Sequence, residues 1–154
     1  MQRMLIREVP SQIGKEVFLK GWVSVRRDHG KLVFLDVRDR SGSVQVVVLP
    51  NHLESCMAVH EVRNETVISL VGRVNERPAN AKKEGELTGA VEIEALELTV
   101  LAKGEEDLPI DVSSVDLDIN LDTLLNNRTV SLRHPKIQAI FRLYSLLLAG
   151  YDQA

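Results

Sequence analysis

Residues 21–49, GWVSVRRDHGKLVFLDVRDRSGSVQVVVL, contain three short segments that alternate between apolar and polar residues or are rich in β-branched residues. Such patterns are typical of β-strands. The tetrapeptide DHGK at 28–31 and the pair Ser41-Gly42 are typical of tight turns, because glycine adopts positive φ at no steric cost. With its N-terminal flank, the stretch predicts consecutive strands at 16–27, 32–39 and 44–49.

Two more strands are predicted further along the chain, at 66–76 and 90–101, and a helix at 52–62 precedes them. Glycines inside the predicted strands, Gly21 and Gly72, indicate bends or bulges of the kind that a small closed sheet needs. Three strands, a helix and two more strands favour an all-β fold, the five-stranded Greek-key barrel known as the OB-fold. An open α+β sheet is the alternative architecture.

The predicted organisation has three parts. Residues 1–102 hold the barrel, and residues 103–120 form an acidic linker or hinge. Residues 121–154 begin a further region, in which Pro135 can start a C-terminal helix. The apolar stripe of that helix predicts packing on another domain or another chain, and a helix folded back on the barrel is the alternative. The stripe consists of Ile137, Ile140, Phe141, Tyr144, Leu147 and Leu148.

Composition excludes several classes of function. The formal net charge is −3, and residues 101–120, with six acidic groups and one basic group, account for the deficit. A single cysteine, Cys56, rules out an internal disulfide or a thiolate metal cluster, and we expect it to face a core. The four histidines show no metal-ligand spacing, and a solvated face explains the acidic pairs Glu92/Glu94 and Asp116/Asp118. We therefore predict no catalytic residue and no metal or cofactor site, and a cytoplasmic protein without a membrane span.

Binding of unstacked nucleic-acid bases has better support. OB barrels bind single strands across their second and third strands, where aromatic side chains stack on bases and polar side chains read base edges. Phe34 lies in the middle of the second predicted strand, with Arg27 beside it and Gln45 on the third strand. A core position for Phe34 is the alternative. We expect Trp22 to plug one end of the barrel.

Several segments are similar to a known family. The block at 21–47 resembles the anticodon-binding domain of aspartyl-tRNA synthetases, especially those of the bacterial type. The segments RNE at 63–65, VGRV at 71–74 and TGAVEIEAL at 88–96 continue the resemblance. Asparaginyl- and lysyl-tRNA synthetases share the fold and part of this sequence pattern. The segments RRDHG at 26–30 and FLDVRDR at 34–40 favour the aspartyl enzymes.

The resemblance implies a role for individual residues. Arg27 matches an arginine that contacts the anticodon, Phe34 the aromatic that stacks on an anticodon base, and Gln45 the glutamine that reads the central uridine. Glu92 matches a glutamate that contacts the anticodon guanine, and Asn80 is the counterpart of a loop asparagine. His29 stands where many members carry leucine, and histidine there goes with relaxed discrimination between tRNA(Asp) and tRNA(Asn); a simple turn residue is the alternative.

The resemblance also implies a larger enzyme. LLNNRTVSLRHPKIQAIFRL at 124–143 resembles the passage into the class II catalytic domain, so that 121–154 would start that domain and its dimer-interface motif. The parent would be a homodimeric aspartate–tRNA ligase that uses ATP and Mg²⁺. These 154 residues lack its catalytic motifs, and we expect them to be inactive alone. The competing prediction is a stand-alone OB module that binds single-stranded nucleic acid or a protein.

Overall fold

The computed structural model describes residues 2–30, 32–52, 54, 56–104, 108–114 and 116–153. Predictions that involve Lys31 in the first turn, Leu53 in the helix at 52–62, or positions 105–107 and 115 of the acidic segment lie outside these described residues. The chain forms two compact units, Met1–Glu106 and Asp107–Ala154.

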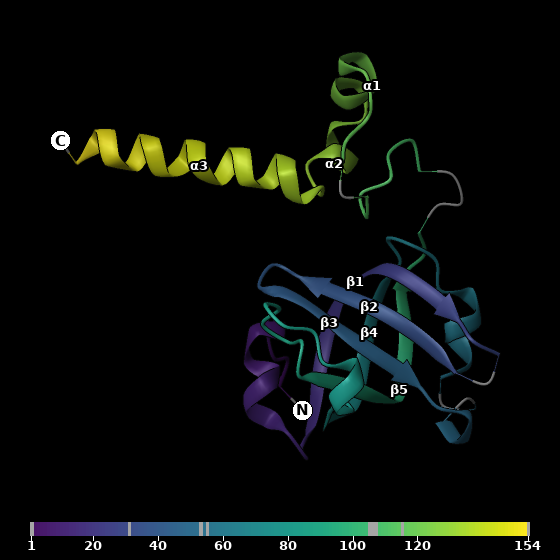
Figure 1. The fold of residues 1–154 in the computed structure, drawn as a ribbon. Coiled ribbons are helices and arrows are strands. Elements are labelled where there is room, and N and C mark those ends of the chain that lie inside the picture. The colour runs from purple at the N-terminus through teal and green to yellow at the C-terminus, as the bar shows by residue number, and fades with distance from the viewer. Residues whose placement is uncertain are drawn as a thin grey trace. The chain divides into compact units, whose positions relative to one another are not determined.

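The first unit contains the strands β1 (Glu16–Asp28), β2 (Val33–Asp39), β3 (Gly42–Val48), β4 (Val67–Glu76) and β5 (Val91–Ala102). They close into a barrel in the order β1-β2-β3-β5-β4 (Figure 1). All neighbouring pairs are antiparallel except β3 and β5, which run parallel. The five-stranded OB-fold prediction is confirmed, and the open-sheet alternative is wrong.

Short 3-10 helices fill the ends and connections of the barrel. The first of them, η1 (Ile6–Gln12), buries Ile6 and Val9 completely in the core. The helix predicted at 52–62 takes the form of two short 3-10 helices, η2 (Pro50–His52) and η3 (Met57–Glu61). A fourth, η4 (Ala79–Ala81), lies in the loop between β4 and β5.

The strands of the barrel alternate between an inner and an outer face. In β2 the side chains of Val33, Leu35 and Val37 are buried, while Phe34 and the polar residues between them are only partly covered. The same alternation runs through β5. Phe34 therefore lies on the outside of the barrel, and its core alternative is wrong.

A β-bulge between Val23 and Val25 changes the face on which the end of β1 presents its side chains. Simple alternation predicts that Val25 shares the inner face of Val23. In the structure Val23 is fully buried, but beyond the bulge Arg27 stands directly opposite Phe34. The extra residue of a bulge shifts the period-two pattern by one position, which turns Arg27 to the outer face.

Trp22 does not plug the barrel, contrary to expectation. It lies on the outer face of β1, opposite Arg38 of β2, and the Arg38 guanidinium lies over its ring at 5.8 Å from the centroid. The positions before and after Trp22 on β1, Gly21 and Val23, are the buried ones. The strand period therefore decides the orientation of this side chain.

The second unit contains the helices α1 (Leu121–Asn126), α2 (Arg128–Ser131) and α3 (Pro135–Asp152), the last of which confirms the helix predicted from Pro135. His134 caps α3: its Nδ1 accepts from the Lys136 amide at 3.2 Å, and its Nε2 lies 2.9 Å from the Ser114 carbonyl. Large apolar side chains of α3 are exposed, namely Ile140, Phe141, Leu143, Tyr144, Leu146, Leu147, Leu148 and Tyr151. No helix in the described part of the chain has the length and apolar character that a membrane span requires.

Candidate nucleic-acid interface

Two rows of side chains cross the outer surface of the barrel. In one row, β-sheet register aligns Arg27 of β1, Phe34 of β2, Val47 of β3 and Glu94 of β5. In the next row, Asp36 of β2 lies opposite Gln45 of β3, and Gln45 contacts Glu92 of β5. We call the outward side chains of these two rows, with His29, the candidate face: Arg27, His29, Phe34, Asp36, Gln45, Val47, Glu92 and Glu94.

Phe34 provides the aromatic surface of the candidate face. Its ring meets His29 edge to face, with centroids 5.6 Å apart and ring planes at 83°. The His29 amide donates to the Leu32 carbonyl at 2.9 Å, and the next residue, Gly30, has a φ of 74°. The turn thus holds the imidazole against the aromatic ring, so two of the predicted site residues form one aromatic pair.

Arg27 is held beside Phe34 by an ion pair. Its guanidinium donates to Asp36 Oδ1 at 2.9 Å, and 42% of the arginine side chain remains exposed. An ion pair this exposed is worth about 0–1 kcal/mol, so Arg27 can exchange Asp36 for another acceptor at little cost. The neighbouring Arg26 is paired with Asp28 at 2.8 Å.

Gln45 and Glu92 form the polar couple of the second row. The Gln45 Nε2 donates to Glu92 Oε2 at 3.3 Å, although the two residues lie 47 positions apart in the chain. The bond leaves the Gln45 carbonyl oxygen and further lone pairs of Glu92 able to accept hydrogen bonds. Together they offer acceptors and a donor beside the partly exposed ring of Phe34.

Asn80 stands apart from these residues. It is exposed on η4, and no hydrogen bond of the described residues joins it to the other five predicted site residues. The structure therefore brings together Arg27, His29, Phe34, Gln45 and Glu92, and leaves Asn80 on the β4–β5 loop.

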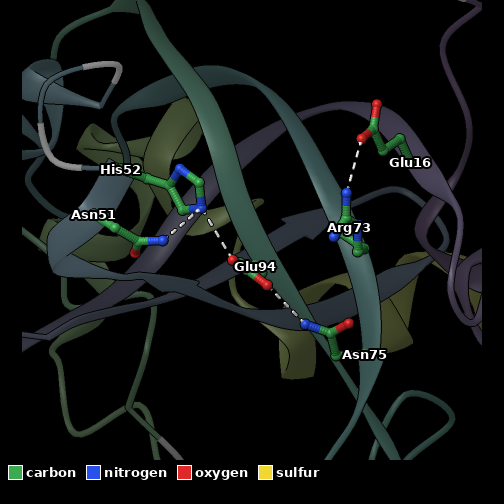
Figure 2. Close-up of polar contacts among 6 residues, drawn as sticks. All are labelled: Glu16, Asn51, His52, Arg73, Asn75 and Glu94. Carbon is green, nitrogen blue, oxygen red and sulfur yellow. Dashed lines mark hydrogen bonds and ion pairs between the residues drawn. The ribbon is translucent and has the colours of Figure 1, made fainter.

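A polar network beside Glu92 was missed by the sequence interpretation. Glu94 accepts at Oε2 from Asn75 Nδ2 and lies at Oε1 against His52 Nε2, both at 3.0 Å (Figure 2). Asn51 Nδ2 lies 3.3 Å from the same histidine nitrogen. The interpretation of Glu92 and Glu94 as a solvated pair is wrong, because both side chains are partly buried and hydrogen-bonded. The spacing of Glu92 and Glu94 in a strand predicts that the two side chains share a face. The contact between His52 and Glu94 could not be predicted in this way, because it depends on the path of the chain after β3.

Within the described residues, no group of three or more histidine, cysteine, aspartate or glutamate side chains is arranged to hold a metal ion. Cys56 is fully buried at the start of η3, as expected of a core residue. Burial raises the pKa of the Cys56 thiol from 9.0 to about 11, with a smaller contribution from the negative charge of Glu97.

This shift predicts a loss of stability in alkali. The folded protein holds the Cys56 proton more tightly than the unfolded chain, so the stabilisation is fully present below pH 9 and is lost as the pH rises through about 11. We expect the midpoint of urea denaturation to fall across this window, and to fall less steeply in Cys56→Ala. Equal slopes in the two proteins would contradict the assignment.

Comparisons with known proteins agree with this fold. The tRNA anticodon model of OB-fold nucleic acid binding domains matches residues 17–101. The aspartyl-tRNA synthetase of Entamoeba histolytica has the same fold, with a TM-score of 0.85 and 21% identity over 99% of this chain and 37% of that one. The asparaginyl-tRNA synthetase of Pyrococcus horikoshii, in complex with asparaginyl-adenylate, has a TM-score of 0.81 and 26% identity over 99% and 34%.

A smaller solved structure matches about two thirds of the chain. OBody AM2EP06, solved bound to hen egg-white lysozyme, is 30% identical over 66% of this chain and 94% of its own, with a TM-score of 0.55. By contrast, the chain spans only about a third of the length of the two synthetases. The family match covers most of the barrel, including all five strands at least in part. The chain therefore belongs to the tRNA anticodon-binding family of OB-fold nucleic acid binding domains.

Proposed function

We propose that the chain binds the anticodon loop of tRNA(Asp) as the N-terminal part of an aspartate–tRNA ligase of the bacterial type. The observation that carries the proposal is the candidate face, where a partly exposed Phe34 lies between Arg27 and the Gln45–Glu92 couple. An aromatic ring surrounded by donors and acceptors suits splayed bases, which need a stacking surface and partners for their edges.

Each residue has a distinct part in the proposed mechanism. A base of the opened loop stacks on Phe34. Arg27 releases Asp36 and donates to the RNA, while Gln45 offers both a donor and an acceptor to the central uridine. Glu92 accepts from the N–H groups of guanine, and a hydrogen bond to a carboxylate is about twice as strong as a neutral one.

His29 determines which tRNAs are accepted. Its ring lies against Phe34, the proposed stacking surface, so the imidazole borders the base that occupies this platform. The anticodons of tRNA(Asp) and tRNA(Asn) differ only in their last base. We therefore propose that the ligase charges both tRNAs, because histidine tolerates either base at that place.

The longer enzyme would supply the chemistry. In the proposal, residues 121–154 begin its class II catalytic domain, which uses ATP and Mg²⁺ to attach aspartate. The exposed apolar side chains of α3 then belong to the interface of a homodimer. On this view the chain alone binds tRNA but does not activate aspartate.

Binding to labelled anticodon stem-loops tests the proposal. We expect fluorescence anisotropy to show tighter binding of the full chain to a GUC loop than to a scrambled loop. A GUU loop, which carries the asparagine anticodon, should bind within a few-fold of GUC. The variant His29→Leu should widen the gap between GUC and GUU while leaving GUC affinity unchanged. Equal binding of GUC and scrambled loops would refute anticodon recognition.

A protein-binding OB module is the second candidate. The OBody relative favours it, because that barrel was solved in complex with a protein, lysozyme. The stem-loop assay separates the two candidates, since a protein-binding module has no preference for GUC over a scrambled loop.

A further inference from the structure

We propose that Glu94, held in place by His52 and Asn75, is a second carboxylate that recognises a base on the RNA-binding face. The base that fits it best is guanine. The inference rests on the proposed function, because it adds a contact residue to the same face. Neither the family resemblance nor the sequence pattern assigns a role to Glu94.

The position of Glu94 places it within reach of a stacked base. Phe34, Val47 and Glu94 are aligned across three adjacent strands. Neighbouring strands lie about 4.8 Å apart, so Glu94 starts on the order of 10 Å from Phe34. Val47 lies between them in this row and is 7% exposed. A base that stacks on Phe34 and is oriented along this row therefore has its edge towards the Glu94 carboxylate.

The network fixes the Glu94 carboxylate without using up its acceptor capacity. Asn75 donates to one oxygen and His52 lies against the other, so the group is held from two sides (Figure 2). Because a carboxylate only accepts, the proton in the histidine contact belongs to His52 Nε2. A carboxylate has about four lone-pair sites, which leaves one on each oxygen. The Glu94 side chain is 19% exposed, so part of it is open to solvent.

The chemistry of the fixed carboxylate favours one base. Guanine presents two neighbouring N–H donors, N1–H and the 2-amino group, to a pair of carboxylate oxygens. Uracil places carbonyl oxygens on both sides of its single N–H and is repelled by the negative charge. Hydrogen bonds to a charged acceptor are the stronger class, so a wrong base at this place carries a clear penalty.

The experiment measures base preference with the full chain. Stem-loops carrying each of the four bases at each anticodon-loop position are titrated against wild type and Glu94→Gln. We expect wild type to prefer guanine at a loop position other than the one assigned to Glu92, and Glu94→Gln to lose roughly tenfold of that preference. Inosine, which lacks the 2-amino group, should weaken binding at this position in wild type and have little effect in Glu94→Gln.

Glu16→Gln is the matched control. Glu16 is also a strand carboxylate with a partner, Arg73 at 3.3 Å, but it lies on β1 where β1 pairs with β4 (Figure 2). Its removal should leave every base preference unchanged, and Trp22 fluorescence shows that both variants remain folded. An inosine effect of equal size in wild type and Glu94→Gln overturns the role of Glu94. If wild type binds the GUC loop no more tightly than a scrambled loop, the proposed function itself is refuted.

Discussion

Phe34→Ala is expected to weaken binding of the GUC stem-loop by about 1–3 kcal/mol, the usual contribution of one base stacked on an aromatic ring. This corresponds to a roughly 5- to 150-fold higher Kd. The ring is on the outer face of β2 and its neighbours in the strand, Val33 and Leu35, carry the packing. The melting temperature should therefore stay close to that of wild type. Fluorescence anisotropy and thermal unfolding measure the two quantities on one sample.

Phe18→Ala is the control for this prediction. Phe18 is an aromatic residue on the outer face of β1, where the strand pairs with β4, and Lys20 Nζ lies 5.4 Å from its ring centroid. It lies outside the candidate face, so its loss should leave RNA affinity unchanged. If Phe18→Ala and Phe34→Ala weaken binding equally, Phe34 is not a specific stacking platform.

Leu35→Ala should have the opposite profile, although Leu35 is the next residue in the chain. Its side chain is fully buried in the barrel core. Truncation of a buried leucine costs about 2–5 kcal/mol of unfolding free energy, through lost burial and the cavity left behind. Each kcal/mol lowers the Tm of a domain of this size by roughly 4–8 °C. Trp22, the single tryptophan of the chain, lies on the outer face of β1 and reports unfolding of the barrel by fluorescence.

Leu87→Ala provides the matched comparison for the core variant. Leu87 lies in the β4–β5 loop and is 65% exposed, so the same change in side-chain size should cost no more than about 0.5 kcal/mol. If Leu35→Ala and Leu87→Ala have the same melting temperature, the inner face of β2 does not contribute to the hydrophobic core. Below its Tm, Leu35→Ala should bind the GUC loop as wild type does.

The candidate face was predictable where it depends on strand period. Phe34 and Leu35 point to opposite sides because consecutive strand residues do so, and the same rule places Glu92 and Glu94 on one face. The bulge in β1 broke this rule. Uninterrupted alternation along β1 would place Arg26 rather than Arg27 on the outer face, and the register with β2 brings Arg27 opposite Phe34.

The amino-acid sequence by itself determined the five strands and the C-terminal helix, because local periodicity, turn glycines and Pro135 act over a few residues. Closure of the barrel was decided by tertiary structure, since the parallel pairing of β3 and β5 brings Gln45 to Glu92 across 47 positions. The same closure brings His52, which lies in a short 3-10 helix, into contact with Glu94 of β5. Contacts of this kind depend on the relative placement of distant segments, which packing of the whole core sets and no local pattern encodes.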